Sequence, residues 1–146
     1  MRRGLLGGLA AVAYEGGAFV GRYTRRGEFM ARVLDVDRLV RQLRPELSAR
    51  MRASRAAFRG ELIVATDEGA AVLSVSADGV VVATGNDRAD ARVDLPHGTL
   101  ARLCLGAYDA ADLLARLPRP PRPEVGALLQ ALFPRRSPHV SPADRF

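Results

Sequence analysis

The chain has 146 residues, which fits one domain with an additional segment at one end. Hydrophobic residues make up 48%, enough for a core, but aromatic residues make up only 5% and Trp is absent, so Leu, Val and Ala must fill that core. All 22 basic residues are Arg and the net charge is +6, yet 16 acidic residues are interleaved and no zinc-finger or RNA-binding pattern occurs, which excludes nucleic acid as an expected partner.

Residues 1–26 form an N-terminal segment whose apolar stretch, after Met1–Arg3, is similar to a short signal peptide. We expect instead a half-buried helix over Leu5–Glu15 and an extended piece over Phe19–Tyr23 in a cytoplasmic protein, with secretion as the alternative. The stretch is too short for a membrane span, which needs about 18 apolar residues. Gly16–Arg22 has the glycine spacing of a phosphate loop but lacks its Lys and Ser/Thr, so we reject a phosphate site.

The next segment predicts a strand followed by an amphipathic helix. Glu28–Leu34 alternates loosely, and Asp35 is placed to cap the helix that follows. Pro45 removes a backbone donor, so we expect a kink or two short helices that meet near Arg44. The predicted apolar stripe is Val36, Leu39, Val40, Leu43, Leu47 and Met51.

From Gly60 onward the hydrophobic period changes to two. The predicted strands are Glu61–Thr66, Ala70–Ser76, Val80–Thr84 and Ala91–Leu95. Short connections with glycine favour hairpins, so we expect an antiparallel meander. A few isolated strands bury too little apolar surface, and one face of this sheet must therefore be covered by helices.

Three helical segments follow the strands. Thr99 is expected to cap a helix that stops at Gly106, and Asp109 to cap a second helix that runs to Leu117. Pro118–Pro123 is a stiff connector to the last helix. Helices before and after a run of strands indicate the α+β class. The stripe of the last helix is Val125, Leu128, Leu129 and Leu132.

Several short stretches, in their order along the chain, resemble a known family. They are Glu28–Val36, Gly60–Leu62, Val93–Pro96, Leu100–Tyr108, Ala131–Pro134 and Asp144–Phe146. The chain is similar to the sterol carrier protein type 2-like domain, and more narrowly to the C-terminal domain of the enhanced intracellular survival (Eis) class of GNAT N-acetyltransferases. This resemblance implies an antiparallel sheet of about five strands covered on one face by helices, in a domain over residues 27–146 with a C-terminal tail. Residues 1–26 would then be a remnant of an upstream lobe.

The resemblance also implies a function for the chain end. The tail holds three prolines after Phe133 and finishes on Phe146, whose terminal carboxylate would act as the base in an acetyltransferase active site. The catalytic lobes of that family are missing, so we expect no activity from this chain alone. An acetyltransferase lobe, in cis or in trans, would be the partner, and acetyl-CoA the cofactor of the whole enzyme.

Two other functions stay open from the residues themselves. The first is a stand-alone sterol-carrier-like module that binds a lipid or another apolar ligand. The second is an interaction module whose arginines dock an acidic partner. A homo-oligomer is also open. We expect no metal site, because Cys104 lies in an apolar context and His97 and His139 have no ligand-like neighbours. Tyr108 is expected in the core or at its rim.

Overall fold

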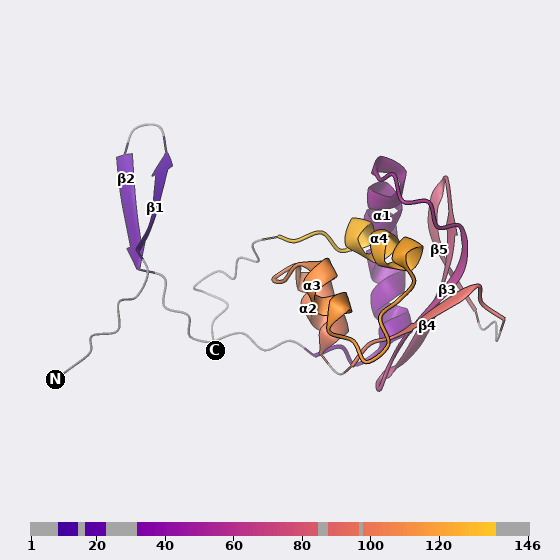
Figure 1. Cartoon of the computed structure of the whole chain (residues 1–146). Coiled ribbons are helices and arrows are strands. Elements are labelled where there is room, and N and C mark those ends of the chain that lie inside the picture. Colours follow the sequence, from indigo (N-terminus) through magenta and orange to yellow (C-terminus); the bar gives the residue numbers. More distant parts are fainter. Residues whose placement is uncertain (1–8, 15–16, 23–31, 85–87, 97, 137–146) are drawn as a thin grey trace. The chain divides into compact units, whose positions relative to one another are not determined.

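The computed structural model describes residues 9–14, 17–22, 32–84, 88–96 and 98–136 (Figure 1). They belong to two compact units, an N-terminal hairpin and a larger body. The hairpin pairs β1 (Leu9–Tyr14) with β2 (Gly17–Arg22) in an antiparallel register.

The helix that we expect over Leu5–Glu15 is therefore wrong wherever the structure describes it, whereas the extended piece is confirmed from Phe19 to Arg22. Tyr14 lies opposite Gly17, so two residues connect the strands, a length that favours a hairpin. A strand partner satisfies the backbone groups that a short, glycine-flanked helix would leave unpaired at its ends.

The first element of the body is α1 (Val36–Ala53). Asp35 is its N-cap, as expected, and its carboxylate accepts a hydrogen bond of 2.9 Å from the backbone N–H of Arg38. The helix passes through Pro45 as one continuous element, so two short helices are not found. Packing of the buried stripe outweighs the lost donor, because Val36, Val40 and Leu47 are almost completely buried.

In the described part of the body the sheet has four strands in the order β5-β4-β3-β6. β3 (Gly60–Thr66), β4 (Gly69–Ser76) and β5 (Gly79–Ala83) form the expected antiparallel meander. β6 (Ala91–Asp94) departs from it, because it lies on the far side of β3 and runs parallel to it. The sheet is thus mixed and four-stranded, and the sterol-carrier-like topology with about five strands stays a prediction that these strands do not confirm.

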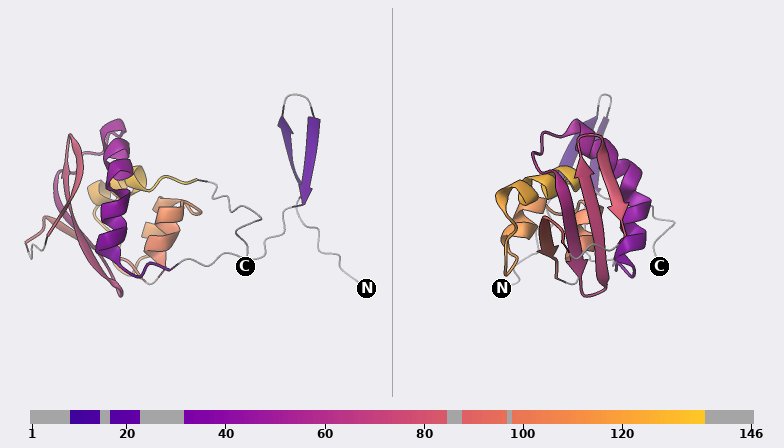
Figure 2. Two further views of the ribbon diagram at one scale, coloured as in Figure 1. Left: turned by 180° about the vertical axis from the view of Figure 1, so that it is seen from behind. Right: turned by 90° about the vertical axis from the view of Figure 1, so that its right-hand side faces the viewer.

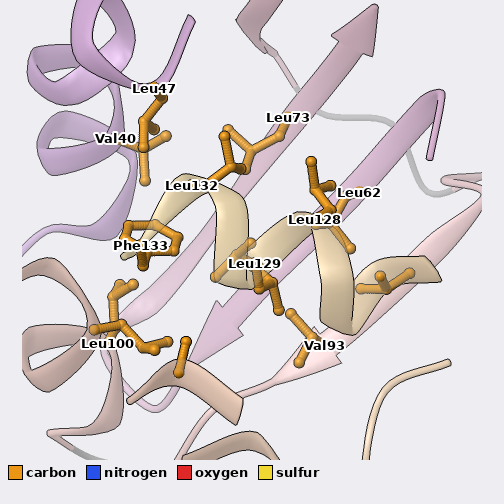
Figure 3. Packing of buried hydrophobic residues seen from close by; sticks show 14 of the residues in the cluster. Val40, Leu47, Leu62, Leu73, Val93, Leu100, Leu128, Leu129, Leu132 and Phe133 are labelled. Carbon is orange, nitrogen blue, oxygen red and sulfur yellow. The ribbon is translucent and has the colours of Figure 1, made fainter. Parts of the chain in front are cut away.

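Hydrogen bonds on both sides of β6 in the chain account for its place. The Asp90 carboxylate accepts a hydrogen bond of 2.8 Å from the Glu61 N–H, and the Leu95 N–H donates to the Ala65 carbonyl at 2.8 Å. At that edge Val93 is buried beneath α4 (Pro123–Leu132) (Figure 3). An outer position beyond β5 would not give Val93 this apolar cover.

Two short helices lie between β6 and α4 in the chain. α2 (Thr99–Leu105) ends at Gly106, as expected, with Gly106 in the left-handed conformation at φ 67°. Its N-cap is Gly98 rather than the expected Thr99, which is buried. α3 (Ala110–Ala115) is capped by Asp109, as predicted, and ends two residues before the expected Leu117.

The helices cover one face of the sheet, which confirms that part of the prediction. Figure 3 shows Leu128, Leu129 and Leu132 of α4 above the strands, with Phe133 between α1 and Leu100. Ile63, Val72 and Val81 alternate with the inward residues and share the other face, over which no helix lies in the right-hand view of Figure 2. The α+β class is therefore confirmed. Arg32–Leu34, part of the strand expected over Glu28–Leu34, are irregular, and residues 28–31 lie outside the described residues.

Candidate functional site

The residues singled out in the sequence are not brought together in one site. Phe146, His97 and His139 lie outside the described residues. Tyr108 is 53% exposed at the rim of the body, with the Arg102 guanidinium 5.6 Å from its ring centroid. In the described part of the chain no three His, Cys, Asp or Glu side chains gather as a metal site would require.

The body carries a groove of about 400 Å³ between the segment before α1, the first turns of α1 and α2. We call it the apolar groove. Leu34 is 76% exposed and joins the other apolar residues of the lining in one contiguous apolar surface. The groove is lined by Arg32, Val33, Leu34, Asp35, Arg38, Leu39, Gln42, Ala101, Cys104 and Leu105.

Local sequence signals shape this groove. The Asp35 cap starts α1 at Val36, so Val33 and Leu34 leave the helix in an irregular segment. Leu34 and Leu39 occupy the two positions, just before the cap and four residues after it, that pack together in a hydrophobic staple. Here Leu34 stays largely exposed and Leu39 half-buried, so this pair leaves apolar surface open to a ligand.

Cys104 contributes an uncharged wall. Burial raises the pKa of its thiol from 9.0 to about 11, and the positive charge of Arg50 offsets only part of this rise. The thiol is therefore protonated at neutral pH and behaves as a small apolar group rather than a nucleophile. Cys104 is half-buried, and its protonated thiol fits the apolar context that its sequence neighbours indicate.

Positive charge lies at the rim of the groove. Arg32 forms an ion pair with Glu68, and that hydrogen bond raises the pKa of Arg32. Arg38 is exposed, and its guanidinium has no hydrogen-bond or ion-pair partner among residues 32–84, 88–96 and 98–136. One guanidinium is thus available to a ligand, since the Arg38 backbone N–H alone is used, by Asp35.

Sequence reasoning did not predict this groove. It assigned Val33 and Leu34 to a strand and treated Leu39 only as part of the helical stripe. The available signal was an apolar pair directly before an N-cap, but its exposure depends on α2, which is more than 60 residues away in sequence.

The arrangement offers apolar contact and one cation, and no nucleophile paired with a base. Within the described helices, none is both long and apolar enough to cross a bilayer. No protein-family model, curated protein or solved structure matches the chain.

Proposed function

We propose that the body is a small binding module that holds a slender apolar ligand with an anionic head group in the apolar groove. The observation that carries the proposal is the exposure of Leu34 beside a groove lined mainly by apolar side chains. Covering such surface is favourable by about 25 cal/mol for each Å² removed from water.

The size of the groove narrows the class of ligand. Its volume of about 400 Å³ lies near the lower end of ligand pockets, which range over roughly 300–1,000 Å³. A single acyl chain of moderate length suits this volume better than a bulky ring system. Each buried methylene would contribute about 0.8 kcal/mol.

The rim selects the head group. The Arg38 guanidinium can donate two parallel hydrogen bonds to a carboxylate, whereas Arg32 is already engaged by Glu68. Asp35 also lines the groove and keeps its negative charge while it accepts the Arg38 N–H, so the head group would be held by hydrogen bonds to the guanidinium rather than by a net positive rim. A fatty carboxylate therefore fits the groove better than a neutral or cationic amphiphile.

Titration with a fluorescent fatty acid, followed by displacement with decanoate or decanol, tests the proposal. We expect saturable binding and stronger displacement by decanoate. Leu34→Asp should weaken binding by about tenfold or more, because it places a charge on the apolar wall. Val81→Asp is the matched control, since Val81 is also an exposed apolar residue, at 55%, and lies on the open face of the sheet. Absence of saturable binding, or equal effects of the two substitutions, would refute it.

A second proposal keeps the function that the sequence resemblance implies. In it the body is the C-terminal accessory domain of an acetyltransferase, and the carboxylate of Phe146 serves the active site of a catalytic lobe. A specific contact favours it: the Arg136 N–H donates a hydrogen bond of 2.7 Å to the Gly106 carbonyl, and the Arg136 guanidinium bonds Glu46 at 2.9 Å. The ten residues after Arg136 would start from this fixed point and reach at most about 35 Å.

Acetyl-CoA would have to be bound elsewhere in such an enzyme. In the described part of the chain, no glycine-rich turn precedes a long helix in the way that a pyrophosphate site requires. The test combines the full chain with a catalytic lobe and compares deletion of Phe146, which moves the terminal carboxylate one residue back to Arg145, with Phe146→Ala, which keeps it at position 146. Deletion should abolish acetyl transfer and the substitution should retain part of it. Full activity after deletion would contradict this proposal.

A further inference from the structure

A second groove lies between α1 and the edge strand β5, and we call it the arginine groove. It consists of two adjoining hollows of about 320 and 300 Å³ that share Arg44, Pro45 and Val81. Among the described strands β5 pairs with β4 alone, and its other edge lies against α1. The groove is lined by Arg41, Gln42, Arg44, Pro45, Ser48, Arg52, Ser76, Asp78, Gly79, Val80, Val81 and Val82.

At one residue the helix replaces a neighbouring strand. The Ser48 hydroxyl donates a hydrogen bond of 2.9 Å to the Val80 carbonyl and accepts one of 3.0 Å from the Val80 N–H. Both backbone groups of Val80 therefore point away from β4, which is expected because Val80 and Val75 face each other across a wide ring of the antiparallel ladder.

Two residues farther along, the same edge has no such partner. The backbone alternates along a strand, so the N–H and carbonyl of Val82 point to the same side as those of Val80. Among the described residues no side chain bonds them as Ser48 bonds Val80. An unpaired strand edge of this kind is a template for another extended segment.

The helix side of the groove also lacks a hydrogen bond. Pro45 has no N–H, so the carbonyl of Arg41 receives no helical bond from the residue four positions later. Pro45 and Arg41 both line the hollow that contains Val82. An inserted backbone would thus meet the unpaired donor and acceptor of Val82 on the strand wall, and on the helix wall a carbonyl that lacks its bond from the residue four positions later.

The charge of the lining defines the partner. Arg44 is exposed and has no ion-pair or hydrogen-bond partner in the described body. Arg52 uses one nitrogen for the Asp78 carbonyl at 3.1 Å, and Asp37 neutralises Arg41. Asp78 is the one acidic residue of the lining among the described residues. The surplus is positive, while the unpaired backbone groups suit a peptide better than a phosphate chain.

We propose that the arginine groove binds an extended acidic peptide of a partner protein. The peptide backbone pairs with Val82 as an added strand residue, and an acidic side chain meets Arg44. Val81, which is 55% exposed, contacts an apolar side chain of the same peptide. Acidic and apolar residues therefore alternate in the sequence that this groove selects.

Fluorescence anisotropy with the full chain tests this inference. The probe is a labelled peptide in which Glu and Val alternate, and its counterpart carries Lys in place of Glu. We expect saturable, salt-sensitive binding of the Glu peptide only. Arg44→Glu should weaken it by about tenfold or more, whereas Arg119→Glu, an equal charge change in the exposed connector before α4, should leave affinity within about twofold.

A backbone-methylated Glu peptide separates strand pairing from simple charge attraction. Methylation of alternate amide nitrogens removes the donors that would meet Val82, and it should abolish binding while the charge is unchanged. Equal binding of the methylated peptide, equal loss in the two Arg variants, or tighter binding of a single-stranded oligonucleotide would each overturn the proposal. The amide resonance of Val82 should shift on binding in the wild-type chain.

Discussion

The two grooves border the same helix and yet present opposite chemistry. The apolar groove contacts the first turns of α1 at Leu39, and the arginine groove contacts its middle at Pro45, with Gln42 lining both. In the first, apolar side chains are left exposed. In the second, the unpaired groups belong to the backbone of β5 and α1, and the arginines surround them.

This difference teaches where binding capacity comes from in a small body with few aromatic residues. The apolar groove depends on side chains that the core does not need, above all Leu34. The arginine groove depends on hydrogen bonds that the fold leaves incomplete at Val82 and Arg41. Changes to side-chain polarity should therefore affect the first groove, and changes to backbone pairing the second.

The largest effect should come from a core substitution in α1, the helix that both grooves border. Leu47 is fully buried on α1, so Leu47→Ala should lower the free energy of unfolding by about 2–5 kcal/mol. Urea denaturation measures this change, and fatty-acid and peptide binding should weaken in parallel. Loss of one ligand alone would show that α1 does not support both grooves.

Alkylation of Cys104 should report on the apolar groove alone. With its pKa raised from 9.0 to about 11, its thiolate fraction at pH 8 is about a hundredth of that of an unperturbed thiol. Iodoacetamide should react correspondingly slowly, and decanoate should slow it further while the acidic peptide should not. Because the folded-state pKa lies above the ordinary value, the protonated thiol contributes folding stability that is complete below pH 9. This contribution is lost as the pH rises through about 11.

Pro45→Ala should act in the other groove. The new N–H can donate to the Arg41 carbonyl, and the helix should gain about 2 kcal/mol after the lost rigidity of proline in the unfolded chain is subtracted. Thermal unfolding measures the gain. Acidic-peptide affinity should fall because one acceptor is removed, and unchanged affinity would exclude the Arg41 carbonyl from the contact.

Ser48→Ala should expose a second pair of backbone groups on β5. The Val80 N–H and carbonyl lose their partner, which should cost about 1–2 kcal/mol of folding stability. Denaturant unfolding gives this value. The acidic peptide should bind at least as tightly as before, because the open edge is longer, and a loss of binding would mean that Ser48 itself contacts the peptide.

The smallest effect should follow from Asp35→Ala at the N-cap. The Arg38 N–H loses its acceptor, with a cost of about 1 kcal/mol. Fatty-acid affinity should change more than peptide affinity, because Asp35 lines the apolar groove. Asp109→Ala removes the N-cap of α3 in the same way and is the matched control. Equal effects on fatty-acid binding would contradict a role for the first turn of α1.

Local patterns predict most of the body. The Asp35 and Asp109 caps, the stripe of α4 and the three antiparallel strands each follow from residues within one element or one turn. The place of β6 could not be predicted, because it depends on Asp90 meeting Glu61, 29 residues earlier in the chain.

The grooves are harder to predict for the same reason. Exposed Arg44 lines the arginine groove, but no local pattern indicates that Ser48 meets Val80, 32 residues later. The N-terminal hairpin was mistaken for a helix because short apolar stretches fit both periods. Where a local pattern fits both a helix and a strand, pairing with another segment decides which of the two forms.

Gly106 connects the end of α2 with the path of the chain after α4, two features that could otherwise form independently. An added Cβ there would lie 2.9 Å from the Pro134 oxygen and from the Arg136 nitrogen, and φ is already left-handed. The end of α2 and the departure of the chain after α4 must therefore form cooperatively. Hydrogen exchange at the Arg136 amide should then proceed only through opening of the whole body, as slowly as exchange at a core strand.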